Sequence, residues 1–227
     1  MSDSRLTKSA KVARVVIAVL SLYFALTLPI VLVFAQSEYA RFIVSQVVTK
    51  WKGKLSGVES AYLGDSLTAG GRNWGEFPDA LNLAGDGYLV RQVAGQVEKA
   101  KSFSPARIYL AAGTNDILAT GEVDLVRFEA DYSEMLDKAL ATGADIVVTE
   151  IPFTANASHT CEIQGANAVI RSLAAARNIR VVVCNDLLAP EGTLLGRYTT
   201  DGVHLSDAAY EEVWIPRLRD SLRPDQR

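Results

Sequence analysis

Residues 60–68 read Ser-Ala-Tyr-Leu-Gly-Asp-Ser-Leu-Thr, a short run that ends in glycine, aspartate and a hydroxyl side chain. The run from Ser60 to Leu63 is a strand candidate, and polar residues follow it at once. Four further short runs rich in Val, Ile, Leu and Ala are strand candidates, at Leu81–Ala84, Arg107–Ala112, Asp145–Ile151 and Arg180–Cys184. Several are apolar on both faces, which is typical of parallel strands covered by helices on both sides.

Helical patterns lie between and after these runs. They span Tyr88–Phe103, Asp124–Ala141, Gln164–Arg177 and Asp207–Leu222, and the first carries one apolar stripe of Leu89, Val93, Val97 and Ala100. Strands that alternate with helices through short loops predict a doubly wound α/β fold. We therefore expect a three-layer α/β/α sandwich with a central parallel sheet of about five strands.

Polar residues follow the predicted strands where ligands usually bind in such sheets, at the carboxyl ends of the strands. Ser66 follows the first strand, Gly85 the second and Asn115 the third, while Asp201 and His204 come after the fifth. A hydroxyl, glycines, an amide, a carboxylate and an imidazole are thus expected along one edge of the sheet.

Acyl transfer needs this set of groups. A serine hydroxyl attacks only when a base takes its proton, and histidine suits that role because its pKa lies near neutral pH. A carboxylate fixes the imidazole tautomer and stabilises the charged form. The tetrahedral oxyanion needs donors already in place, and the backbone N–H groups of Ser66 and Gly85 and the Asn115 amide are candidates. Glycine at position 85 would leave room for a substrate to approach the backbone.

The same residues carry a resemblance to the SGNH, or GDSL, hydrolase superfamily. Its four sequence blocks are matched in order by Gly64-Asp65-Ser66-Leu67, Asn82-Leu83-Ala84-Gly85, Gly113-Thr114-Asn115-Asp116 and Asp201-Gly202-Val203-His204. The resemblance implies a flavodoxin-like fold and hydrolysis of esters or thioesters, without a metal or an organic cofactor. It implies the catalytic residues Ser66, His204 and Asp201, and an oxyanion hole formed by Ser66, Gly85 and Asn115.

The N-terminal part differs from the rest in charge and hydropathy. Residues 1–14 form a basic tail, and the uncharged run from Val15 to Ala35 is about as long as the ~30 Å hydrocarbon core of a bilayer is thick. We interpret 15–35 as a transmembrane anchor, with a cleaved signal peptide as the alternative. Residues 1–35 carry a net charge of +3 and the whole chain −3, so the body is acidic, which argues against a nucleic-acid partner.

This gives a predicted domain order of tail 1–14, anchor or signal 15–35, linker helix 36–56 and hydrolase domain 57–227. The basic tail favours a cytoplasmic N-terminus and a domain outside the cytoplasm, either anchored or secreted after cleavage. A disulfide between Cys161 and Cys184 is then chemically permitted. His159 is expected to stabilise a loop rather than take part in catalysis.

The expected function is that of an extracytoplasmic serine esterase acting on short-chain or O-acetyl esters of a small molecule, glycan or lipid. An O-acyltransferase on envelope glycans, or a lysophospholipase or thioesterase, would use the same residues. A non-catalytic binding domain on this fold would be expected to have lost one of Ser66, Asp201 or His204. Candidates for substrate binding follow the serine, at Arg72, Trp74 and Phe77, although the two aromatic residues could equally belong to the core.

Overall fold

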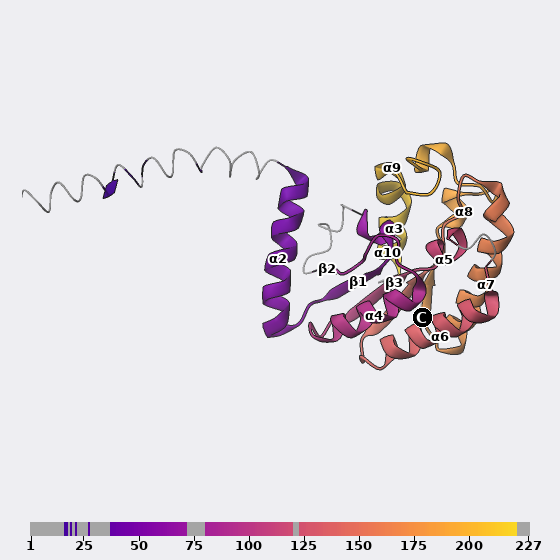
Figure 1. Ribbon diagram of the computed structural model, residues 1–227, viewed down its shortest axis with the longest axis horizontal. Coiled ribbons are helices and arrows are strands. Elements are labelled where there is room, and N and C mark those ends of the chain that lie inside the picture. Colours follow the sequence, from indigo (N-terminus) through magenta and orange to yellow (C-terminus); the bar gives the residue numbers. More distant parts are fainter. Residues whose placement is uncertain are drawn as a thin grey trace, which may run out of the picture. The chain divides into compact units, whose positions relative to one another are not determined.

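The computed structural model describes residues 16, 17, 19, 21, 27, 37–71, 80–119 and 123–221. The chain forms two compact units, residues 1–45 and 46–227. The second unit contains a parallel sheet of five strands in the order β2-β1-β3-β4-β5 (Figure 1). The strands are β1 (Ser60–Gly64), β2 (Ala80–Asn82), β3 (Arg107–Ala111), β4 (Asp145–Thr149) and β5 (Arg180–Val182). The predicted parallel sheet of five strands flanked by helices is therefore confirmed.

One face of the sheet packs against three long helices, α4 (Val90–Lys101), α6 (Leu125–Leu140) and α7 (Thr160–Ala176). Because side chains alternate along a strand, every second residue points to this face. The main core forms there, and its strand residues include Ala61, Leu63, Ile108, Leu110, Ile146 and Val148. The apolar stripe predicted for the first helix contributes Val93, Val97 and Ala100, all fully buried.

The intervening strand residues point to the opposite face. The rings of Tyr62 and Tyr109 stack there with centroids 4.7 Å apart. Trp214 and Leu218 of the C-terminal segment line the same small space as these two rings and are buried. Helices therefore cover both faces of the sheet.

The C-terminal segment is not the single helix that was predicted over 207–222. It consists of α9 (Asp207–Ala209), a π-helical stretch η4 (Tyr210–Trp214) and α10 (Ile215–Asp220). Pro216 lies in the first turn of α10. Proline lacks a backbone N–H and cannot donate an intrahelical hydrogen bond, which fits the change of helix type just before it.

Helix α2 (Glu38–Ser56) covers most of the predicted linker helix and crosses the boundary between the two units. In the second unit, the side-chain amide of Gln46 pairs with edge strand β2. Its Nε2 donates to the Ala80 carbonyl at 3.0 Å, and its Oε1 accepts from the Asn82 N–H at 2.9 Å. An edge strand exposes unpaired backbone groups, and Gln46 satisfies two of them.

Several short helices were not predicted from the sequence. They are α3 (Ser66–Ala69), α5 (Thr114–Leu118), η2 (Ala157–His159), α8 (Asn185–Leu188) and η3 (Gly196–Tyr198). Within the described residues, no helix combines the length and apolarity needed to cross a bilayer. The predicted anchor 15–35 lies outside the described residues except at positions 16, 17, 19, 21 and 27.

Candidate active site

Ser66 stands at the end of β1, as the first residue of α3. Asp65 caps this short helix, because its Oδ1 accepts a hydrogen bond from the Leu67 N–H at 3.0 Å. The strand end itself is fixed by Gln96 of α4, whose side-chain amide bonds both the N–H and the carbonyl of Gly64, at 2.8 and 2.9 Å. As the first residue of a helix, Ser66 has a backbone N–H without an intrahelical partner.

His204 and Asp201 lie in the loop before α9 and reach Ser66. The Nε2 atom of His204 is 3.1 Å from Ser66 Oγ, and its Nδ1 atom is 2.6 Å from Asp201 Oδ2. The other carboxylate oxygen, Oδ1, accepts from the backbone N–H groups of Val203 and His204 at 3.0 and 2.8 Å. This tight turn needs a positive φ of 93° at Gly202, a conformation that glycine adopts without strain.

The charges in this loop fix the imidazole tautomer. The hydrogen bonds from the His204 ring and from the two backbone N–H groups lower the pKa of Asp201 to about 2. The carboxylate is therefore ionised at neutral pH and can only accept hydrogen bonds. The proton of a neutral imidazole then sits on Nδ1, which leaves Nε2 free to accept the hydroxyl proton of Ser66. The structure thus brings the three residues together in hydrogen-bonding order.

Asn115 lies on α5, beyond the carboxyl end of β3 and therefore beside the end of β1. Its Nδ2 donates one hydrogen bond to the Tyr88 carbonyl at 3.1 Å, and the amide has a second hydrogen. The preceding Gly113 has φ 123°, and a Cβ there would lie 2.6 Å from Ile151 Cδ1. Next to Asn115, Asp116 accepts a hydrogen bond from the Val90 N–H at 3.0 Å, so its carboxylate orders the start of α4.

Gly85 is held by a backbone hydrogen bond and by close packing. Its backbone N–H donates to the Gly64 carbonyl at 3.1 Å. On the side where a side chain would project, the ring of Tyr88 packs against Gly85, because a Cβ at position 85 would lie 2.7 Å from a ring carbon. Glycine is therefore required here by Tyr88. To donate to an oxyanion, the Gly85 N–H would have to share its hydrogen with the Gly64 carbonyl or give up that hydrogen bond.

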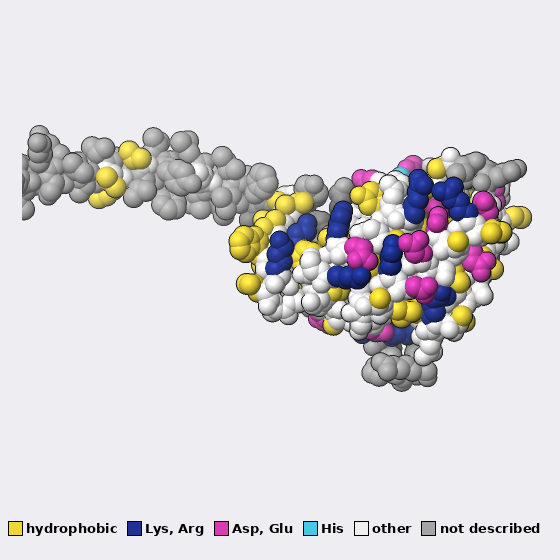
Figure 2. All heavy atoms as spheres, turned by 60° about the horizontal axis from the view of Figure 1, so that its bottom comes forward, with side chains coloured by type: hydrophobic (Ala, Val, Ile, Leu, Met, Phe, Trp, Pro, Cys, Tyr) yellow, Lys and Arg dark blue, Asp and Glu magenta, His cyan; other side chains and the backbone are white. Residues whose placement is uncertain are grey.

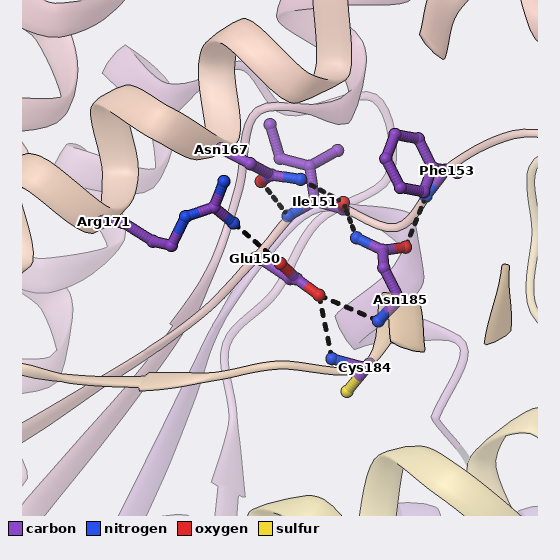
Figure 3. Close-up of polar contacts among 7 residues, drawn as sticks. All are labelled: Glu150, Ile151, Phe153, Asn167, Arg171, Cys184 and Asn185. Carbon is purple, nitrogen blue, oxygen red and sulfur yellow. Dashed lines mark hydrogen bonds and ion pairs between the residues drawn. The ribbon is translucent and has the colours of Figure 1, made fainter. Parts of the chain in front are cut away.

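A buried polar network holds the segment that follows β4 (Figure 3). Asn167 bonds both the N–H and the carbonyl of Ile151, at 2.7 and 2.9 Å. Asn185 bonds the same carbonyl at 2.9 Å and accepts from the Phe153 N–H at 2.8 Å. Glu150 Oε1 accepts from the N–H groups of Cys184 and Asn185, at 2.9 and 2.8 Å, and Oε2 lies 3.2 Å from Arg171.

This network supports the catalytic loop indirectly, through the segment that follows β4. Beyond the fixed segment, the Ala155 N–H donates to the Gly202 carbonyl at 2.7 Å, next to Asp201. A hollow of about 430 Å³ lies beside this contact and is lined by Leu118, Thr154–Ala157, His159 and Asp201–Val203. His159 also lies 3.3 Å from Glu162.

Sequence reasoning did not single out Gln96, Asn167 and Asn185, which are all buried. The only available signal for two of them was a polar amide inside a helical pattern.

The substrate-binding candidates Arg72, Trp74 and Phe77 lie outside the described residues. Cys161 is exposed, Cys184 is buried, and both are free. In the part of the chain that the structure describes, no group of three or more His, Cys, Asp or Glu side chains could hold a metal ion.

A parallel sheet of order 2-1-3-4-5 places its ligand site where the order reverses, between β1 and β3. Ser66 and Asn115 follow those two strands, and His204 and Asp201 complete the edge. These features define the class as an α/β protein of the SGNH hydrolase superfamily. Residues 62–212 match the GDSL-like Lipase/Acylhydrolase family, and the chain belongs to that family.

Solved structures show the same fold. A GDSL-like lipase from Bacteroides thetaiotaomicron is 22% identical with a TM-score of 0.63, over 72% of this chain and 88% of that one. An acetyl xylan esterase is 19% identical with a TM-score of 0.61, over 72% of this chain and 99% of that one. A lipase/acylhydrolase from Enterococcus faecalis is 17% identical with a TM-score of 0.58, over 74% and 98%. Comparison with curated proteins gives no match.

Proposed function

We propose that the chain is a serine esterase that cleaves acyl esters through an acyl-serine intermediate. The observation that carries the proposal is the hydrogen-bonded series of Ser66, His204 and Asp201, with distances of 3.1 and 2.6 Å. Proton transfer from Ser66 to His204 needs donor and acceptor within hydrogen-bonding distance, and this pair meets the condition. Asp201 holds and stabilises the ring without taking the proton.

The reaction follows from these contacts. His204 Nε2 takes the hydroxyl proton as Ser66 Oγ bonds to the ester carbonyl carbon, and the carbonyl oxygen becomes the oxyanion. The ester bond then breaks, and the leaving alcohol takes the proton from His204. A water molecule then gives a proton to the same nitrogen and attacks the carbonyl carbon of the acyl-serine. The bond from that carbon to Ser66 Oγ breaks, Oγ takes the proton back from His204, and the free acid leaves. Asp201 stabilises the charged imidazole in both halves.

The donors for the oxyanion are the backbone N–H of Ser66 and the second amide hydrogen of Asn115. Each such donor contributes about 3–4 kcal/mol when it is fixed before the reaction. The hydrogen bond from Asn115 to the Tyr88 carbonyl fixes the amide without using both of its hydrogens. Gly85 becomes a third donor only if its bond to Gly64 is shared or broken.

The substrate that we propose is a short-chain or O-acetyl ester, including that of a glycan. The hollow beside Asp201 is lined by polar as well as apolar groups, with Thr154, Asn156 and His159 among them. One of the similar structures is that of an acetyl xylan esterase. We place the domain outside the cytoplasm, anchored by residues 15–35 or released after cleavage, on the basis of the charge and hydropathy of the first 35 residues.

The test compares the full chain with its Ser66→Ala variant on nitrophenyl esters of graded chain length. Ser102→Ala is the matched control, because Ser102 is an exposed serine at the end of α4. We expect the control to match the wild type and Ser66→Ala to lose nearly all activity, with acetate or another short ester as the best substrate. Equal rates for Ser66→Ala and wild type would refute the proposal. Acyl groups found on an added sugar, in place of free acid, would identify a transferase.

A further inference from the structure

The second half of α2 exposes a row of large apolar side chains. Val47, Val48, Trp51 and Leu55 have exposed fractions of 53%, 57%, 75% and 87%. We call these four residues the outer face of α2. Figure 2 shows hydrophobic side chains gathered on this helix, with basic side chains beside them. Isolated exposed apolar residues are common, but a contiguous row of this kind usually marks an interaction site.

The row lies away from the sheet. Thr49 and Gly53 are buried, and a Cβ at position 53 would lie 2.5 Å from Val58, so this side of the helix packs on the domain. At 3.6 residues per turn, Val47, Trp51 and Leu55 fall on the opposite side. The outer face therefore has no partner within the described part of this unit and points to solvent.

Basic residues border the row on both sides. Lys50 and Lys54 lie along one margin, where they line a hollow of about 340 Å³ with Val47, Trp51 and Phe103, and Lys52 lies along the other. Residues 46–56 contain no acidic residue, although the chain as a whole is acidic. The partner should therefore offer both apolar groups and negative charge over a broad surface.

A bilayer containing anionic lipids offers both. Amphipathic helices lie in the headgroup region with their apolar side chains at the acyl boundary, and each nearby lysine adds about 1 kcal/mol. Tryptophan and lysine are favoured at this depth because each has an apolar body and a polar end. A second copy of the chain fits less well, because pairing of two outer faces about a two-fold axis would bring lysines against lysines.

We propose that the outer face of α2 docks the domain onto the surface of an anionic bilayer. The proposal depends neither on the esterase reaction nor on whether residues 15–35 span the membrane. Helix α2 is also linked by hydrogen bonds to the helix that carries Ser66. The Gln46 side chain accepts from the Asn82 N–H of β2. The Asn82 side chain in turn donates, at 3.1 Å, to the Thr68 carbonyl of α3, which is the helix that carries Ser66.

The test places a polarity-sensitive fluorophore at Leu55→Cys in the full chain, in a Cys161→Ser background because Cys161 is the exposed thiol. The labelled chain is reconstituted in vesicles of phosphatidylcholine alone and of phosphatidylcholine mixed equally with phosphatidylglycerol. The control label is at Val126→Cys on α6, which is 81% exposed. We expect a blue shift and quenching by brominated acyl chains for Leu55→Cys in the anionic vesicles only, and neither change for the control.

Charge dependence gives the second readout. The paired change Lys50→Gln and Lys54→Gln is expected to lower the ratio of docked to undocked label by about 30-fold. Each lysine contributes about 1 kcal/mol of attraction to an anionic bilayer, and the two contributions add. Raising the salt from about 0.1 to 1 M, which shortens the Debye length from about 10 to 3 Å, should have the same direction of effect. A Leu55→Cys label as water-exposed as the control in anionic vesicles would overturn the proposal. So would a shift that follows protein concentration and ignores lipid charge, because it would indicate a second copy.

Discussion

Replacing Asp65 by asparagine tests the electrostatics beneath the nucleophile. The Asp65 side chain is 1% exposed and lies next to Ser66 in the chain. Burial raises the pKa of its carboxyl to about 6, although the hydrogen bond from the Leu67 N–H acts in the opposite direction. Asparagine keeps an oxygen that can accept the same bond and caps a helix about as well as aspartate. The substitution therefore removes the ionisation and little else.

The sign follows from the two pKa values. In the unfolded chain the carboxyl ionises near pH 3.8, and in the folded protein near pH 6. Between these values the folded protein retains a proton that the unfolded chain has lost, so the free energy of unfolding falls as the pH rises. At about 1.4 kcal/mol per pH unit, a pKa difference of about two corresponds to about 3 kcal/mol. Above pH 7 the Asp65→Asn variant should be more stable than the wild type by up to this amount, and below pH 4 the two should be equal.

The assay is urea unfolding of the full chain from pH 4 to 8, followed by tryptophan fluorescence, to which the buried Trp214 contributes. Asp137→Asn is the control with the opposite sign. Asp137 is exposed and bonds Arg177 at 2.8 Å, which lowers the pKa of its carboxyl. Its contribution is present above the unfolded pKa and is lost as the pH falls through the folded pKa, so this variant should be the less stable one at neutral pH. A gap between Asp65→Asn and wild type that did not change with pH would refute the reasoning.

Three further substitutions test the site and its support. Asp201→Asn should keep the fold and lower kcat/KM by roughly 10³–10⁴-fold on a nitrophenyl ester, because His204 loses the carboxylate that fixes its tautomer. Gly85→Ala should lower the free energy of unfolding in urea by about 1–3 kcal/mol through its clash with the Tyr88 ring, and should cost little in a Tyr88→Ala background. Glu150→Ala leaves two buried backbone N–H groups without an acceptor and should cost about 2–4 kcal/mol by the same assay, whereas Glu150→Gln should cost less.

The strands could be predicted because parallel strands between helices need apolar residues on both faces. The ends of the strands were less predictable, because most of the apolar runs of the sequence extend beyond the last residue that belongs to the strand. The strand predicted to reach Ile151 ends at Thr149, and the backbone of Ile151 bonds the side chain of Asn167 instead. The strand predicted to reach Ala84 ends at Asn82, whose side chain accepts from the Ala84 N–H at 2.9 Å. In both cases an asparagine takes over where the ladder stops.

The core of the site was also within reach of the sequence. Parallel strands bring their carboxyl ends to one edge, so Ser66 and Asn115 were expected along the same edge, and the turn from Asp201 to His204 is local. That the two strands are neighbours is known only from the strand order in the structure. The environment of Gly85 was not predictable, because the ring that fills its space comes from a residue whose side-chain direction depends on tertiary packing. Gln96 was hidden for a related reason. One amide within a helical pattern does not reveal that it binds a strand end 32 residues upstream.

Two buried carboxyl groups support this site, and the structure predicts opposite effects for removing their charge. Glu150 accepts from two backbone N–H groups and lies 3.2 Å from Arg171, so hydrogen bonds and a cation offset the loss of hydration. The Asp65 carboxylate accepts from the Leu67 N–H, and the nearby negative charge of Asp116 disfavours its ionised form. The cost of burying a charged carboxylate is therefore largely uncompensated at Asp65, whereas hydrogen bonds and Arg171 compensate it at Glu150. It follows that removing the charge of Asp65 should stabilise the fold, whereas removing Glu150 should loosen the segment that holds the catalytic loop.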